Sequence, residues 1–182
     1  MSTDHTDLSQ LQSREECLKL LSASSISAMR LRKLGDNHSA YPKQIASLAE
    51  VCAHLMTVYS EEPQSIVAKM EESLVTELQK ERQFIDSEIT TLFERRKRFT
   101  ANTMYGEKEI VDLTVQISTL ERRRSMPMGE LVQKVICDTL NQICVDHGSS
   151  MLGTIDPDHY EYHDDTVNQS SEQSDPHSIT PK

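Results

Sequence analysis

The residues best suited to chemistry in this chain are acids and histidines near its C-terminal end. Seven carboxylate or imidazole side chains fall within ten positions: Asp156, Asp158, His159, Glu161, His163, Asp164 and Asp165. Such groups bind divalent cations when a fold gathers several around one point. The stretch lacks the glycine and closing glutamate of an EF-hand loop, however, and the chain contains no H-E-x-x-H. We therefore expect no built metal site and no cofactor.

Cys144 and His147 form a second pair of potential ligands, one helical turn apart. Without another pair they are too few for a zinc site, so we interpret Cys144 as a core residue and His147 as a helix end. The chain also contains no nucleophile elbow, no P-loop and no G-x-G. We expect no catalytic residue, and the protein is not expected to be an enzyme.

Two short strings could be modified by kinases. Arg122-Arg123-Arg124-Ser125 resembles a site for kinases that read upstream arginines, and Thr180-Pro181 resembles a proline-directed site. A phosphate on Ser125 would bring two negative charges to the point where one expected helix ends and the next begins. Ser125 is therefore the candidate phosphorylation site.

The basic runs 95–98 and 122–124 could bind phosphates or an acidic partner. The formal net charge is −10, however, and affinity for nucleic acid comes largely from lysine and arginine meeting phosphates. Nucleic acid is therefore not an expected partner, and contact through 95–98 is kept as the weakest alternative. We interpret both runs as solvated helix faces that pair with Glu88, Glu94 and Glu121.

A seven-residue repeat runs through the middle of the chain and organises everything else. Apolar residues recur at both core positions of the heptad, which is typical of a coiled coil. Arg96 also falls in the seam, where a polar residue selects register and partner at a cost in stability. The predicted partner seam comprises Val75, Leu78, Ile85, Ile89, Leu92, Arg96, Phe99, Ile110, Leu113, Ile117 and Leu120.

We expect one continuous helix over residues 64–125, because the heptad keeps its phase throughout. Its weak point is 100–106, a candidate hinge, since threonine, asparagine and glycine are poor helix formers. A complete fold-back into a hairpin there is the alternative. The unbroken phase favours continuity, because a loop need not preserve the register.

Four other segments flank this helix. Residues 1–12 are polar and expected to be flexible, and 13–60 should form an N-terminal helical hairpin opened by a capping box at Ser13. Residues 127–147 should form a docking helix, since Pro127 interrupts the chain before it. The segment 154–182 is acidic and expected to be disordered. The predicted docking faces are Ile45, Leu48, Cys52, Leu55, Leu131, Val135, Leu140 and Ile143.

The composition supports an elongated all-α protein. Aromatic residues make up only 4% of the chain, which is too few for a thick globular core, and its aliphatic side chains suit thin helix–helix seams. No run approaches the length of a membrane span, and the N-terminal residues do not resemble a secretory signal. The four cysteines form no close pairs, so we expect an intracellular, cytoplasmic or nuclear, location.

These features predict a non-catalytic structural or adaptor subunit that assembles with other coiled-coil chains. The polar seam favours hetero-association over a homodimer. The alternative is a compact monomeric helical bundle, broken at 100–106, that acts as a peptide-binding or regulatory module.

Overall fold

The computed structural model describes residues 13–35, 38–99 and 104–163, and within these ranges it contains helices and turns but no strand, which confirms the all-α prediction. None of the described helices combines the length and apolar composition needed to cross a bilayer. The elements in chain order are α1 (Arg14–Lys33), α2 (Tyr41–Val58), α3 (Pro63–Lys97), α4 (Met104–Arg124), α5 (Met128–His147) and the short 3-10 helix η2 (Ser149–Leu152).

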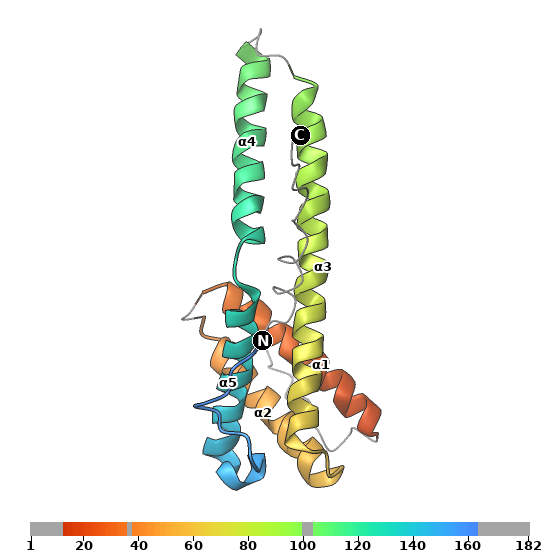
Figure 1. Ribbon diagram of the computed structural model, residues 1–182, viewed down its shortest axis with the longest axis vertical. Helices are drawn as coiled ribbons and strands as arrows, with labels where there is room; N and C mark the ends of the chain where they lie inside the picture. Colours follow the sequence, from red (N-terminus) through yellow and green to blue (C-terminus); the bar gives the residue numbers. More distant parts are fainter. Residues whose placement is uncertain (1–12, 36–37, 100–103, 164–182) are drawn as a thin grey trace, which may run out of the picture.

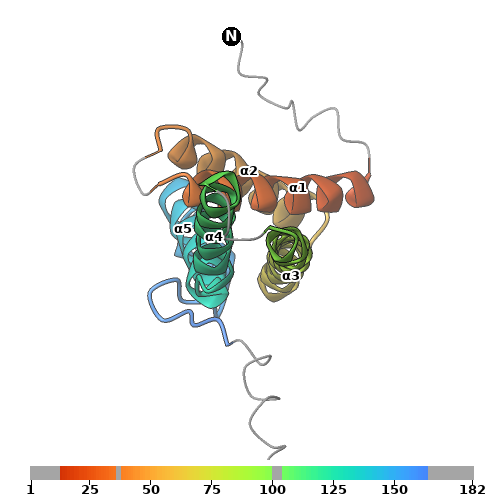
Figure 2. The same ribbon diagram turned by 90° about the horizontal axis from the view of Figure 1, so that it is seen from above.

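Helix α3 is the spine of the molecule. Its 35 residues extend about 50 Å at the usual helical rise of ~1.5 Å per residue. Its first half packs against α1 and α5, and its second half runs beside α4 (Figure 1). We call residues 81–97 of α3 together with α4 the stalk. The remaining described helices and residues 63–80 of α3 form the base, where α1 crosses the first half of α3 (Figure 2).

The N-terminal boundary of α1 follows directly from local sequence. The Ser13 hydroxyl accepts a hydrogen bond from the Glu16 amide at 3.2 Å, and the Ser13 amide donates to the Glu16 carboxylate at 3.1 Å. This is the predicted capping box, which satisfies amides that the first helical turn leaves free. Gly35 follows the helix with a φ of 141°, a conformation that favours glycine.

The main core lies in the base. Helices α1, α2, α3 and α5 each contribute fully buried apolar residues, among them Leu21, Leu48, Leu74 and Ile136. The two helices of the predicted N-terminal segment 13–60 pack against each other, and α5 packs on α2. The face of α5 that the sequence marked as a docking face is therefore covered by the chain itself.

The prediction of one continuous helix over 64–125 is wrong. Helix α3 ends at Lys97, α4 begins at Met104, and the two helices lie side by side and antiparallel (Figure 1). Ion pairs give the register: Arg123 contacts Glu81 at 3.0 Å near the base, and Arg95 contacts Glu109 at 3.5 Å near the tip. The candidate hinge at 100–106 includes residues 100–103, which lie outside the described ranges.

The physical reason for the fold-back is that a stripe of apolar side chains must be buried, but it can be buried against the same chain as well as against another chain. In the stalk Ile85 and Ile89 of α3 meet Ile117 of α4, with Leu92 and Leu120 packed beside them. Closing a short loop costs little entropy, so the complementary stripe of the same chain is always available at high local concentration. Preserved heptad phase is compatible with a hairpin as well as with a rod.

The prediction of disorder from residue 154 onward is also wrong for residues 154–163. Ile155, Tyr160 and Tyr162 pack against the base core. The Tyr160 hydroxyl donates to the Glu71 carboxylate in α3, and its backbone carbonyl accepts from Gln133 in α5 at 3.1 Å. The prediction of disorder was based on the average composition of residues 154–182, which is polar and acidic. That average does not reveal the three apolar residues that anchor the segment to the base. Residues 1–12 and 164–182 lie outside the described ranges.

Candidate interaction surfaces

The residues predicted as a partner seam are covered mainly by the chain's own helices. Val75 and Leu78 belong to the base core, and Leu113 is 1% exposed in the stalk. Phe99 and Ile110 are half-buried near the tip. The other apolar members form the small stalk core: Ile85, Ile89, Leu92, Ile117 and Leu120. The apolar stripe from which we predicted partner chains is thus buried mainly by helices of the same chain.

Arg96 keeps its place in the seam but binds within the stalk. Its Nη1 donates to the Thr114 hydroxyl of α4 at 3.4 Å, and its guanidinium lies 5.7 Å from the centre of the Phe93 ring. A charged side chain at a seam position loses hydration unless it gains such partners. Arg96 therefore marks the register of α3 against α4.

The predicted docking faces are components of the base core. On α2 all four residues are buried, and on α5 Leu131 is half-buried while the other three are buried. The α2 set is Ile45, Leu48, Cys52 and Leu55, and the α5 set is Leu131, Val135, Leu140 and Ile143. Helix α2 packs against α1 and α5, and α5 packs against α1, α2 and α3, so the hydrophobicity of these faces is explained by the fold.

A surface that the sequence analysis missed lies along the outside of α4. Met104, Val111 and Val115 are exposed by 83%, 58% and 60%. Their spacings of seven and four residues place them on one helix face, opposite the buried Leu113 and Ile117. We call these three residues the outer stripe. The spacing of these three residues is visible in the sequence. The heptad repeat is the stronger pattern, however, and it predicted the interaction surface on the opposite face of the helix.

Exposed apolar side chains concentrate on the stalk. Of the ten large apolar side chains exposed in the described residues, six lie on residues 81–97 and α4. Isolated exposed apolar residues are ordinary on a protein surface, whereas a concentration of them indicates an interaction site. The six are Phe84, Phe93, Met104, Tyr105, Val111 and Val115.

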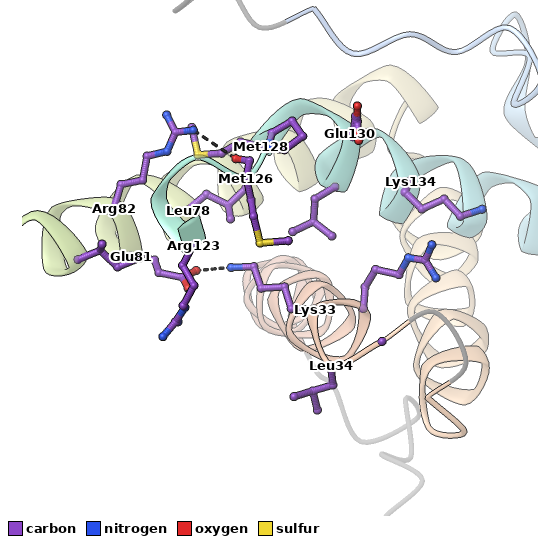
Figure 3. A pocket seen from close by; sticks show the side chains of 15 residues that line it. Lys33, Leu34, Leu78, Glu81, Arg82, Arg123, Met126, Met128, Glu130 and Lys134 are labelled. Carbon is purple, nitrogen blue, oxygen red and sulfur yellow. Dashed lines mark hydrogen bonds and ion pairs between the residues drawn. The ribbon is translucent and has the colours of Figure 1, made fainter. Parts of the chain in front are cut away.

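The second surface is a cavity of about 820 Å³ where the stalk meets the base (Figure 3). The end of α1, the middle of α3, the segment joining α4 to α5 and the first turns of α5 enclose it. We call it the junction pocket. Leu78 and Ile85 supply buried apolar lining, and Met126 and Leu34 are exposed apolar residues of its lining. Four separate elements build it, so no sequence motif could have announced it.

The polar lining of the junction pocket is organised around Glu81. Its carboxylate accepts hydrogen bonds from Lys33 of α1 and, at 3.0 Å, from Arg123 of α4 (Figure 3). Burial alone would raise the pKa of Glu81, but the hydrogen bonds and charges of Lys33 and Arg123 outweigh it, so the pKa lies below its ordinary value. Glu81 therefore ties together three helices that meet at the pocket.

The basic runs and Ser125 are placed differently from one another. In the run 95–98, Arg95 pairs with Glu109 and Lys97 pairs with Glu94 at 2.6 Å. In the run 122–124, Arg123 reaches Glu81 and Arg124 reaches Asp86 at 3.0 Å. Two cations of each run therefore pair with acids of the stalk. Ser125 is exposed and donates to the Arg122 carbonyl at 2.9 Å, at the edge of the junction pocket.

No group of three potential metal ligands occurs within residues 13–35, 38–99 and 104–163. Asp156 and His159 contact each other at 2.8 Å, which raises the pKa of His159 and lowers that of Asp156, mainly through this hydrogen bond. Asp158, Glu161 and His163 are exposed. Cys144 packs against the base core and His147 ends α5. The candidates Asp164, Asp165 and Thr180 lie outside the described residues.

No protein-family model matches the chain, and neither the curated proteins nor the solved structures contain a match to it.

Proposed function

We propose that this protein is a non-catalytic adaptor subunit of an intracellular assembly, and that the stalk binds helices of a partner chain. The observation that carries the proposal is the outer stripe. Met104, Val111 and Val115 are large apolar side chains that α3 leaves in water, on a helix whose other face is already buried. Burying such a side chain stabilises a complex by about 1.5–3 kcal/mol, so a partner helix laid along α4 would gain several such contributions.

The stalk also suits this role mechanically. It projects beyond the base as two antiparallel helices (Figure 1). The ion pairs Arg95–Glu109 and Arg124–Asp86 hold these helices together near the tip and near the base. A preformed helical surface loses little conformational entropy when a partner docks, which favours binding.

An intracellular location is supported by the cysteines. All four are free thiols, and Cys17 and Cys52 are buried in the base core. Unpaired cysteines are ordinary in a reducing compartment, whereas exported proteins tend to oxidise theirs. Cytoplasm and nucleus fit equally well.

The test compares two double variants of the full chain as bait in native cell extract. Val111→Glu with Val115→Glu charges the outer stripe, and Val58→Glu with Val145→Glu makes the same change at exposed valines of the base. We expect proteins bound by the wild type to be retained by the base variant and lost by the stripe variant. Reconstituted with one identified partner, the stripe variant should bind at least about tenfold more weakly, or about 1.4 kcal/mol. Equal binding by both variants would overturn the proposal.

A second candidate function is a self-contained helical module that binds a peptide. The junction pocket favours it, because a concave site with apolar lining and charged residues is the usual form of a small recognition site. The same bait experiment separates the two candidates. Loss of binding on Arg82→Glu, in the lining of the pocket, together with full binding by the stripe variant would favour the module.

A further inference from the structure

The junction pocket is basic in a protein that is acidic overall. Its lining holds five cationic side chains, Arg32, Lys33, Arg82, Arg123 and Lys134, against the two carboxylates of Glu81 and Glu130. The formal net charge of the whole chain is −10. A hollow lined by one sign of charge concentrates its field and attracts groups of the opposite sign.

The acids near the pocket leave part of this positive charge uncompensated. Lys33 and Arg123 share the single carboxylate of Glu81, so two cations meet one anion. Lys134 pairs with Asp138 at 2.8 Å, outside the lining. Among the described residues, Arg82 donates to the backbone carbonyl of Met126 at 3.5 Å and has no ion pair with an acid. An anionic occupant would therefore meet an excess of donors.

The apolar lining adds a second requirement for the occupant. Met126 lies among the pocket residues with 58% of its surface exposed, beside the half-buried Met128 and Leu131. Figure 3 shows the Met126 side chain extending into the space between Lys33 and Leu78. A purely polar anion would leave this apolar surface in water. A peptide with several carboxylates and a few aliphatic side chains matches both parts of the lining.

We propose that the acidic C-terminal segment of this chain, residues 164–182, docks in the junction pocket. The segment contains four acids and one base, together with two aliphatic residues, Val167 and Ile179. Its carboxylates match the excess cations of the pocket, and its aliphatic side chains match the apolar lining. The docking is intramolecular and competes with acidic peptides from other proteins for the same lining.

The position where the described chain ends makes this docking geometrically simple. The Tyr162 ring packs against the first turn of α5: a Cβ at Gly129 would lie 3.6 Å from Cδ1 of Tyr162. Gly129 stands between Met128 and Glu130, which both line the pocket. Part of the pocket lining therefore lies within ~10 Å, one helix diameter, of Tyr162. Nineteen residues can extend about 60 Å, so the segment reaches every part of the pocket.

Tethering makes even a weak site effective. A segment joined to its site by a short flexible linker acts at an effective concentration on the order of millimolar. Charge attraction of this kind weakens as salt is added, because exposed charges are screened over about 10 Å at 0.1 M salt. The docked fraction should accordingly fall at high ionic strength.

The test is zero-length carbodiimide cross-linking of the full chain, which joins carboxylates to lysines in direct contact, followed by mass spectrometry. Equal amounts of ¹⁴N-labelled and ¹⁵N-labelled chain are mixed, so that links within one chain differ in mass from links between copies. We expect links from Glu172 or Asp175 to Lys33 and Lys134, within one chain, and far fewer to Lys19 and Lys108 outside the pocket. These links should decrease as salt is added.

Arg82→Gln should reduce the pocket links several-fold, while Arg98→Gln, the same change at the exposed residue that follows α3, should leave them unchanged. The link between Lys33 and Glu81 serves as the internal control, because those two groups already form an ion pair. Absence of segment links at Lys33 and Lys134 while that control link forms would overturn the proposal. It would equally be overturned by links spread evenly over all lysines, or by links found only between copies, which would assign the pocket to the segment of a second copy.

Discussion

The hydroxyl of Tyr41, at the start of α2, donates a 2.8 Å hydrogen bond to the Asp138 carboxylate in α5, which is 97 positions away in the sequence. Asp138 also accepts from Lys134 at 2.8 Å, and the Arg32 guanidinium lies 5.7 Å from the centre of the Tyr41 ring. The contact joins three helices of the base next to the junction pocket. It is a polar clasp that adds to the apolar packing of the base, as the contact of Tyr160 with Glu71 also does.

This clasp predicts a particular loss of stability at alkaline pH. Burial first, and the neighbouring Asp138 second, raise the pKa of Tyr41 far above its ordinary value of 10.0. Above about pH 10 the unfolded state therefore binds fewer protons than the folded state, and the free energy of unfolding falls by up to about 1.4 kcal/mol per pH unit. Tyr41→Phe removes this pH-dependent contribution. It should also lower the free energy of unfolding by about 1–2 kcal/mol at neutral pH, because the hydrogen bond to Asp138 is lost.

Urea unfolding of the wild type and of Tyr41→Phe between about pH 7 and about pH 11 measures both effects. The stability difference should narrow as the pH rises, because only the wild type loses the Tyr41 contribution. Parallel pH profiles for the two proteins would contradict the expected titration of Tyr41.

Glu81 should show the opposite pH dependence. Its pKa is lowered in the folded state, so its contribution is present above its ordinary pKa of 4.5 and is lost as the pH falls through the folded value. Glu81→Gln is expected to lower the free energy of unfolding by about 1 kcal/mol at neutral pH. The difference from the wild type should vanish in acid.

Thermal or urea unfolding at neutral pH and at about pH 3 measures this difference. The matched control is Glu130→Gln, at an exposed acid in the same lining, which should change stability by less than about 0.5 kcal/mol. A deficit of Glu81→Gln that persists in acid would show that the carboxylate charge is not what stabilises the junction.

Truncating a side chain of the small stalk core should unfold the stalk while the base stays folded. Ile117 is 3% exposed, and Ile117→Ala is expected to cost about 2–4 kcal/mol of stalk stability. Amide hydrogen exchange should accelerate across α4 and the end of α3, while α2 and α5 stay protected. The control is Val115→Ala on the exposed side of the same helix, with a change of less than about 0.5 kcal/mol. Equal acceleration in the stalk and the base would refute the separation of the two cores.

Leu92→Asp illustrates why the stalk core is a poor place to test partner binding. Leu92 packs against Ile85, Ile89 and Ile117 within the chain, so a carboxylate there opens the hairpin itself. We expect weaker protection of the stalk tip in this variant even in the absence of any partner. Charging the outer stripe avoids this effect.

The cysteines should react in two groups. Burial raises the pKa of Cys52 to about 12, so almost no thiolate is present near neutral pH. Cys137 and Cys144 are partly exposed, and burial raises the pKa of both less severely. Alkylation of the folded protein, followed by peptide mass spectrometry, should modify Cys137 and Cys144 first and spare Cys17 and Cys52. All four should react in denaturant, and early labelling of Cys52 would contradict the base packing.

Ser125→Asp tests the candidate phosphorylation site together with the docked segment. Ser125 is exposed and lies between Arg123 and Met126, which both line the junction pocket. A negative charge there should repel the carboxylates of residues 164–182 and reduce their cross-links to Lys33 and Lys134. Ser118→Asp, at an exposed serine on the stalk, is the matched control. Unchanged cross-linking in Ser125→Asp would remove the reason to regard Ser125 as a regulatory position.

Local sequence determined several helix boundaries, although it did not give the end of α3 at Lys97 or the start of α4 at Met104. The capping box at Ser13 starts α1, Pro127 separates α4 from α5, and Gly148 follows the end of α5 at His147. These boundaries depend on hydrogen bonds and backbone conformations within a few residues, which the sequence specifies directly. The side chains that the apolar periodicity assigned to the seam and to the docking faces are all buried or half-buried.

Only the tertiary structure decided what those side chains are buried against. The heptad stripe from Leu78 to Leu120 has the same phase whether the helix continues or folds back, because hydrophobic burial has no preference for another chain over the same one. The junction pocket draws on four elements, and the contact of Tyr160 with Glu71 spans 89 positions. Such relationships depend on the packing of whole helices in three dimensions, and no short stretch of residues encodes them.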